Sequence, residues 1–110
     1  MKLLKEMRLP VTWGGQQIYI LSIFIDGCYP MTDDSIYYVG IETEEQEEVH
    51  LEISVNMPEW MHKKGEFFCR TDQRFGLAEI IYELKKQKII HCYGDGFATP
   101  DRWANKAIIV

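Results

Sequence analysis

The chain has 110 residues, of which 46% are hydrophobic and 13% aromatic, so it can form one domain with its own core. This composition excludes an intrinsically disordered chain, and no apolar run approaches the roughly 20 residues of a membrane-spanning helix. The 17 acidic and 12 basic residues give a net charge of −5, whereas nucleic-acid binders usually carry a dominant basic face. We expect a single domain over residues 1–110 that binds neither membranes nor nucleic acid directly.

Three cysteines at wide spacing, Cys28, Cys69 and Cys92, form neither a disulfide framework nor a CxxC pair. Free thiols are typical of a reducing compartment. The N-terminal stretch MKLLKEMRLP lacks the continuous apolar segment and the small-residue cleavage site of a signal peptide. The sequence therefore predicts a cytoplasmic protein.

The N-terminal part of the chain predicts a β-hairpin. Apolar residues alternate over Met7–Trp13, and Pro10 suggests an edge strand because proline cannot donate to a strand ladder. Gly14-Gly15 is a turn signal. The next run, Gln17–Ile25, is apolar on both faces, which favours a central strand that is covered on both sides.

A second hairpin is predicted over Ser35–Asn56. Its strands are Ser35–Glu42 and Glu48–Asn56, and Thr43–Glu47 forms its tip. The second strand alternates between apolar and polar residues, as a half-buried strand does. We expect its apolar positions to face the core: Val49, Leu51, Ile53 and Val55.

The C-terminal half combines strands with one helix. After a short strand at Glu66–Thr71, apolar residues recur at helical spacing and predict a helix from about Phe75 to Gln87, with Asp72 as its candidate N-cap. Lys88–Tyr93 is either a strand or the buried end of that helix, and the chain closes with the strand Lys106–Val110. We therefore expect an α+β fold: a twisted antiparallel sheet of about 5–6 strands built from hairpins, with one main helix (about 75–87) packed on one face.

Motifs that would carry chemistry are sparse. The cysteines and histidines lack the short paired spacings of structural zinc sites. Only His91 and Cys92 are neighbours, and adjacent residues of a strand point to opposite faces. Gly94-Asp95-Gly96 is interpreted as a turn and not as a phosphate loop, because no helical pattern follows it. We predict no metal, no cofactor and no catalytic residue.

Negative charge is concentrated in the middle of the chain. From Asp26 to Trp60 there are ten acidic residues and no lysine or arginine. Such a field steers a basic partner and speeds its association, or it is a solvated hairpin end that keeps a sheet edge from aggregating. Tyr37, Tyr38 and Trp60 either anchor an interface or belong to the core.

From Val49 onward the chain contains, in order, a strand with its turn, a short aromatic strand, a helix, a Gly-Phe turn and a terminal strand: Val55-Asn56-Met57-Pro58, Phe67–Thr71, Leu77–Ile90, Gly96-Phe97 and Ala107–Val110. In this order of features the chain resembles a family of short proteins of unknown function carried by conjugative elements and prophages of Gram-positive bacteria. The resemblance implies a small accessory protein of a mobile element, a context in which binders or inhibitors of host machinery are frequent. It implies no catalytic residues.

We therefore expect a small acidic, non-enzymatic protein-binding module of phage or mobile-element type, for instance an inhibitor of a basic nucleic-acid-binding or defence protein. One alternative is a small enzyme or ligand-binding domain around His91, Cys92 and Asp95. Another is a structural module that forms a homodimer through an edge strand, either the one with Pro10 or the C-terminal one. The expected partner-binding residues are Glu42, Glu44, Glu45, Glu47, Glu48, His50 and Glu52.

Overall fold

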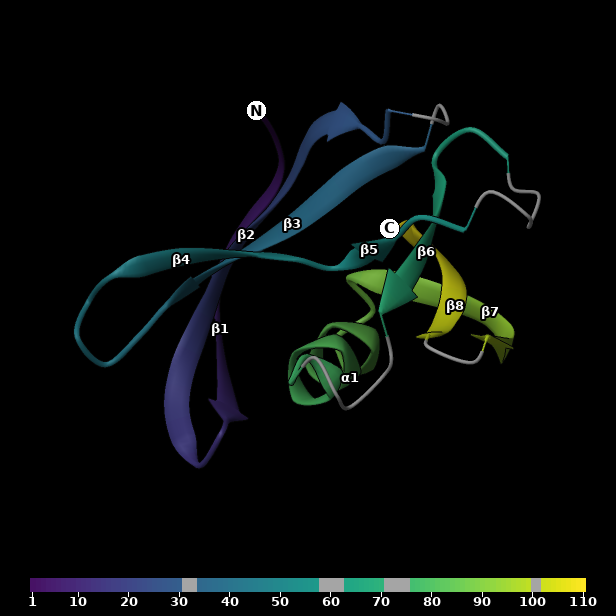
Figure 1. The fold of residues 1–110 in the computed structure, drawn as a ribbon. Helices are drawn as coiled ribbons and strands as arrows, with labels where there is room; N and C mark the ends of the chain where they lie inside the picture. The colour runs from purple at the N-terminus through teal and green to yellow at the C-terminus, as the bar shows by residue number, and fades with distance from the viewer. Residues whose placement is uncertain (31–33, 58–62, 71–75, 100–101) are drawn as a thin grey trace. The chain divides into compact units, whose positions relative to one another are not determined.

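The computed structural model describes residues 1–30, 34–57, 63–70, 76–99 and 102–110, in two compact units, Met1–Ile53 and Ser54–Val110 (Figure 1). The fold is α+β, with mostly antiparallel strands and a short helix. Among the described residues no helix is long and apolar enough to cross a membrane. That the chain behaves as one domain stays a prediction.

The first unit is a four-stranded antiparallel meander in the order β1-β2-β3-β4. Its strands are β1 (Lys2–Trp13), β2 (Gln16–Cys28), β3 (Ser35–Glu42) and β4 (Glu48–Glu52). The predictions that the strand with Pro10 lies at an edge and that the following strand is central are confirmed. Each strand pairs with the next one in the chain, because tight turns favour antiparallel hairpins.

One face of this sheet is apolar and largely buried. Val49 is 36% exposed and Leu51 is half-buried, so the expectation that Val49 faces the core is wrong. Residues that pair across antiparallel strands lie on the same face. Val39 pairs with both Ile23 and Leu51, and Ile41 pairs with Val49, so aliphatic side chains stack from strand to strand. The buried members of this face and its margins include Val11, Ile18, Ile20, Ile23, Tyr37, Val39, Ile41 and Ile53.

The second unit is a four-stranded sheet in the order β5-β6-β8-β7, with a helix in the connection. Both β6 and β7 run antiparallel to β8, so they are parallel to each other and are joined through α1. This arrangement is a split β-α-β unit. Its elements are β5 (Ser54–Val55), β6 (Glu66–Arg70), α1 (Ala78–Lys86), β7 (Ile90–Thr99) and β8 (Arg102–Ile109).

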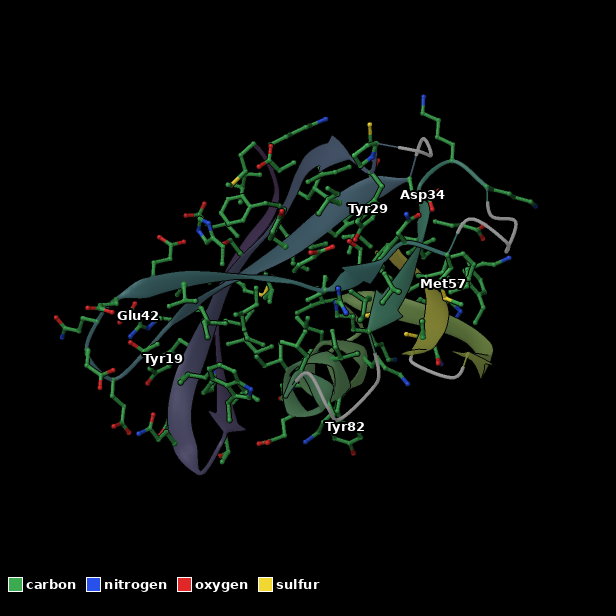
Figure 2. The ribbon with its side chains drawn as sticks, in the orientation of Figure 1. Tyr19, Tyr29, Asp34, Glu42, Met57 and Tyr82 are labelled. Atoms are coloured by element: carbon green, nitrogen blue, oxygen red, sulfur yellow. The ribbon has the colours of Figure 1, made fainter. Side chains whose placement is uncertain are left out.

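The helix α1 packs one amphipathic stripe into the core of the second unit. Ile80, Ile81 and Leu84 are buried, whereas Tyr82 is 66% exposed. A second group of buried residues in this unit consists of Val55, Met57, Phe68 and Ala104 (Figure 2 labels Met57 and Tyr82). The predicted N-cap Asp72 and the predicted start at Phe75 lie outside the described residues.

The helix ends in a Schellman motif. The N–H of Lys88 donates to the carbonyl of Lys85 at 3.0 Å, and the N–H of Ile89 donates to that of Leu84 at 2.9 Å. Lys88 has φ +59° in this motif, at the position where glycine is the usual residue.

Two expectations from the sequence about the sheets are wrong. The described residues form two four-stranded sheets, not one sheet of five or six strands. The alternating run Glu48–Asn56 is not one strand: β4 ends at Glu52, the N–H of Ile53 donates to the Tyr37 carbonyl at 2.9 Å, and Ser54–Val55 pairs with β6 in the other sheet. Alternation shows which residues share a face, but it does not show which strand they pair with.

The remaining corrections concern the C-terminal strands. Gly94-Asp95-Gly96 is not a turn, because it lies within β7 at a register shift against β8. The ambiguous run Lys88–Tyr93 resolves into the helix end followed by the start of β7. The C-terminal strand β8 lies between β6 and β7, so the expectation that it offers a free edge for dimerisation is wrong.

Candidate functional site

The hairpin of β3 and β4 brings the predicted acidic residues together on one face and at one tip. Glu42 pairs directly with Glu48, Gly40 with His50, and Tyr38 with Glu52. Pairing places Glu42, Glu48, His50 and Glu52 on the face opposite the apolar one. The other predicted residues, Glu44, Glu45 and Glu47, lie in the exposed tip that connects the strands.

The tip has a defined backbone conformation. The N–H of Gln46 donates to the Thr43 carbonyl at 2.9 Å, and the N–H of Thr43 donates to the Glu47 carbonyl at 3.0 Å. Gln46 has φ +60°. A turn followed by a residue in the left-handed region is the geometry of a three-residue hairpin loop with a bulge. Glu44 and Glu45 therefore occupy the turn itself.

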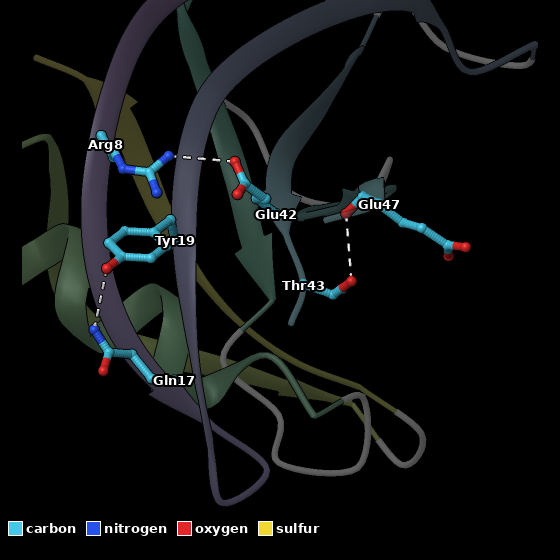
Figure 3. Close-up of polar contacts among 6 residues, drawn as sticks. All are labelled: Arg8, Gln17, Tyr19, Glu42, Thr43 and Glu47. Atoms are coloured by element: carbon cyan, nitrogen blue, oxygen red, sulfur yellow. Dashed lines mark hydrogen bonds and ion pairs between the residues drawn. The ribbon is translucent and has the colours of Figure 1, made fainter. Parts of the chain in front are cut away.

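Glu42 is held by a cation that sequence reasoning missed. Arg8 of β1 places its Nη1 3.3 Å from Oε2 of Glu42, and its guanidinium lies 4.0 Å from the ring centroid of Tyr19 (Figure 3). Gln17 in turn donates its side-chain N–H to the hydroxyl of Tyr19 at 3.5 Å. The Arg8 side chain remains 58% exposed, so this ion pair is a surface contact of modest strength.

These residues border a shallow hollow of about 370 Å³. It is lined by Arg8, Gln17, Tyr19, Glu42, Thr43, Glu44 and Gln46. Sequence reasoning missed Arg8 of β1 and Gln17 and Tyr19 of β2, because they belong to a different hairpin from the acidic residues. Only the register of β2 against β3, which pairs Tyr19 with Glu42, shows that they adjoin the acidic residues.

A second cluster on the same face surrounds Gly40. Nε2 of His50 lies 3.3 Å from Oε1 of Glu48, and the His50 ring lies 5.0 Å from the ring of Phe24. A Cβ on Gly40 would meet the side chains of Ser22, Glu48 and Phe24 at once. The glycine therefore leaves the space that these side chains fill.

Glu52 at the far end of β4 is bound by a tyrosine. The hydroxyl of Tyr29 donates to Oε1 of Glu52, and the N–H of Tyr29 donates to the carbonyl of Asp34 at 2.9 Å. Figure 2 labels Tyr29 and Asp34. Glu52 is half-buried, so it is less available to a partner than the tip glutamates are. Of the expected aromatic anchors, Tyr37 is 5% exposed, Tyr38 is half-buried, and Trp60 lies outside the described residues.

The alternative site around His91, Cys92 and Asp95 is only partly described. His91 pairs with Ile108 and Cys92 with Ala107, so these two side chains point to opposite faces of β7. Burial raises the pKa of the Cys92 thiol, although Lys85 partly offsets this, and burial also raises the pKa of Cys69. Reactive cysteines have a lowered pKa, so neither environment favours a thiolate nucleophile. The side chain of Asp95 lies outside the described part.

In the described residues no group of three or more His, Cys, Asp or Glu side chains is arranged to hold a metal ion. The charges divide between the units. Met1–Ile53 contains three basic and ten acidic residues, a net charge of −7, and Ser54–Val110 contains nine basic and seven acidic residues, a net charge of +2. The acidic character of the chain therefore resides in the first unit.

Comparisons with protein-family models, with curated proteins and with solved structures find no match for this chain. The arguments for function therefore rest on the geometry of its own residues.

Proposed function

We propose that the protein is a non-enzymatic binding module whose β3–β4 hairpin docks against a basic surface of a protein partner. The observation that carries this proposal is the set of unneutralised carboxylates at the tip. Within the described part of the chain, Glu42 pairs with Arg8 and Glu48 with His50, but Glu44, Glu45 and Glu47 make no ion pair.

Physical chemistry favours a docking role for such a tip. Like charges that cluster on a surface raise the free energy of the free protein, and a cationic partner relieves this repulsion. Because Glu42 pairs directly with Glu48, their two carboxylates lie side by side on the same face of the hairpin, and this juxtaposition of like charges is destabilising by itself. Complementary charge also raises the association rate and makes it depend on salt.

The face beside the tip adds contacts that are not electrostatic. Tyr19 and Tyr38 are half-buried on this face, next to Glu42 and Glu52 respectively. Aromatic side chains beside charged ones are frequent anchors at interfaces. In the finer form of the proposal the partner is a host defence or nucleic-acid enzyme, since spaced carboxylates can occupy a surface that binds phosphates.

The experiment compares two variants with equal loss of charge. The tip variant carries Glu44→Gln, Glu45→Gln and Glu47→Gln, and the control variant carries Glu6→Gln, Glu79→Gln and Glu83→Gln. The probe is a fluorescent oligo-arginine peptide, and its dissociation constant is measured by anisotropy at about 50 mM and about 300 mM NaCl, where screening differs strongly.

We expect the tip variant to weaken binding about tenfold at low salt, with a smaller effect at high salt, since three carboxylates each contribute modestly. The control variant should stay within about twofold of the wild-type constant. Equal weakening in both variants would show that the peptide senses only the net charge, and the proposal would then fail.

A homodimer is a second candidate, favoured by the edge of the first sheet. The strand β1 spans Lys2–Trp13 and pairs only on its β2 side among the described residues; Leu3 on it and Met1 just before it are exposed. Long edge strands with exposed apolar side chains tend to pair with a second chain. Light scattering over a range of concentrations tests this, since a constant monomer mass excludes it.

A further inference from the structure

The second unit contains a hollow of about 400 Å³ where the end of α1 adjoins β7 and β8. It is lined by Lys85, Lys88, Ile90, His91, Ile108 and Val110. None of these residues belongs to the acidic hairpin, and none was predicted as a binding residue apart from His91.

The floor of this hollow is apolar. Ile90 is 2% exposed and Ile108 is half-buried, whereas Val110 is 57% exposed. The N–H of Val110 donates to the Ile89 carbonyl at 2.9 Å, which extends the end of β8 alongside the start of β7. A large exposed aliphatic side chain beside a concave surface gains free energy when an apolar group covers it.

The rim of the hollow carries three basic side chains. Lys85, Lys88 and His91 are exposed, and within the described residues none of the three is in an ion pair with a carboxylate. The last carbonyls of α1 are already bonded to backbone N–H groups in the Schellman motif. The ammonium groups are therefore not required to satisfy the helix end.

The Schellman motif at the end of α1 fixes the backbone of Lys88 beside the hollow. Lys88 lies at φ +59°, where a side chain costs free energy that glycine would avoid. Here the strained residue places its side chain on the rim of the hollow.

We propose that this hollow binds a small molecule that has an apolar body and a single carboxylate. The carboxylate lies between Lys85 and Lys88, with His91 beside them, and the apolar body covers Ile108 and Val110. Ligand pockets of this kind have a volume of about 300–1,000 Å³, mostly apolar walls and a few polar groups that fix orientation. Charge complementarity selects an anion, and the apolar floor selects against a purely polar one.

A macromolecular anion fits this surface less well. Nucleic-acid binders spread many cations over an extended face, whereas the second unit has a net charge of only +2. An acidic peptide would leave the exposed Val110 uncovered unless it also carried apolar residues. A single carboxylate on an aliphatic chain provides both a negative charge for the basic rim and an apolar group that covers the floor.

The test uses octanoate as the probe and octanol as its neutral counterpart, with amide chemical shifts followed by NMR on the full chain. We expect octanoate to shift the amides of Ile90, His91 and Ile108 in a saturable way. Octanol should bind about tenfold more weakly, because it lacks the charge that the lysines pair with. Equal affinity for the two compounds would overturn the proposal.

Two double variants with the same charge change sharpen the test. The rim variant, Lys85→Gln with Lys88→Gln, removes the two lysine charges at the hollow. The control variant, Lys64→Gln with Lys86→Gln, removes the charges of two exposed lysines of the same unit that do not line the hollow. The rim variant should weaken octanoate about tenfold, and the control should stay within about twofold. If the rim variant and the control variant weakened octanoate binding equally, the proposed site would be contradicted. Tighter binding of an oligo-glutamate peptide or of a single-stranded oligonucleotide than of octanoate at the same amides would also contradict it.

A third variant separates binding from folding. Lys88→Gly removes an ammonium from the rim and also relieves the left-handed backbone, so it should raise the melting temperature while it weakens octanoate. A variant that is more stable and binds as well as the wild type would overturn the assignment of Lys88 to the site.

Discussion

The guanidinium of Arg8 stacks on the ring of Tyr19, with 4.0 Å between Cζ and the ring centroid. The same guanidinium pairs with Glu42 at 3.3 Å. The acidic face thus already accommodates an arginine in the geometry that arginine favours, with the plane on an aromatic ring and an N–H toward a carboxylate. A partner that offers arginine can use the same chemistry beside or in place of Arg8.

This geometry predicts a preference for arginine over lysine. Oligo-arginine should bind the protein more tightly than oligo-lysine of equal length, because an ammonium is more strongly hydrated and stacks less well. Arg8→Gln should improve arginine binding about threefold to tenfold, since the internal competitor contributes about 1 kcal/mol. Lys2→Gln, which removes the same charge from β1, is the matched control. Equal gains for both peptides in Arg8→Gln would contradict a specific guanidinium site.

The hairpin tip carries strain that a single substitution relieves. Gln46 has φ +60° in the three-residue loop. Gln46→Gly should stabilise the protein by about 1 kcal/mol, because glycine adopts this region without steric cost. Urea unfolding measures the change, and Gln46→Ala is the control that keeps a Cβ and should not stabilise. A loss of stability in Gln46→Gly would refute this backbone conformation.

Gly40 and Ser22 should be energetically coupled. A Cβ on Gly40 would clash with Oγ of Ser22, which is buried and has no hydrogen-bond partner among the described residues. Gly40→Ala should therefore destabilise the fold by about 1–3 kcal/mol. Ser22→Ala should be neutral or slightly stabilising, because it removes a buried hydroxyl without a partner.

The double-mutant cycle tests the contact itself. In the Ser22→Ala background the cost of Gly40→Ala should fall by about 1 kcal/mol, since the clashing oxygen is absent. Additive effects, measured by urea unfolding of all four proteins, would show that Ser22 does not limit the space above Gly40.

The thiols predict a dependence of stability on pH. Burial raises the pKa of Cys69 and of Cys92 above that of an unfolded thiol, about 8.5. A raised pKa in the folded state stabilises the protein below the unfolded pKa, and this contribution is lost as the pH rises toward the folded values. The free energy of unfolding should therefore decline above about pH 8.5, and less steeply in a Cys92→Ala variant. Alkylation at pH 8 should modify the exposed Cys28 first.

The local features of this fold were predictable from the sequence. The two hairpins of the first unit, the edge position of the strand with Pro10 and the acidic tip at Thr43–Glu47 all depend on residues close together in the chain. The amphipathic spacing around Leu84 likewise identified the helix. Alternation and turn chemistry report such short-range structure directly, because a strand or helix must present its apolar residues to one side.

Only the tertiary structure decided which strands pair. The run Glu48–Asn56 divides between two sheets at Ile53, and β6 pairs with β8 across the intervening α1 and β7. The contact of Arg8 with Glu42 likewise joins residues 34 positions apart. Such long-range choices depend on strand register and on the summed packing of both partners, and neither leaves a pattern in a single segment of the chain. The sequence alone determined where the negative charge lies, and the structure decided which side chains surround it.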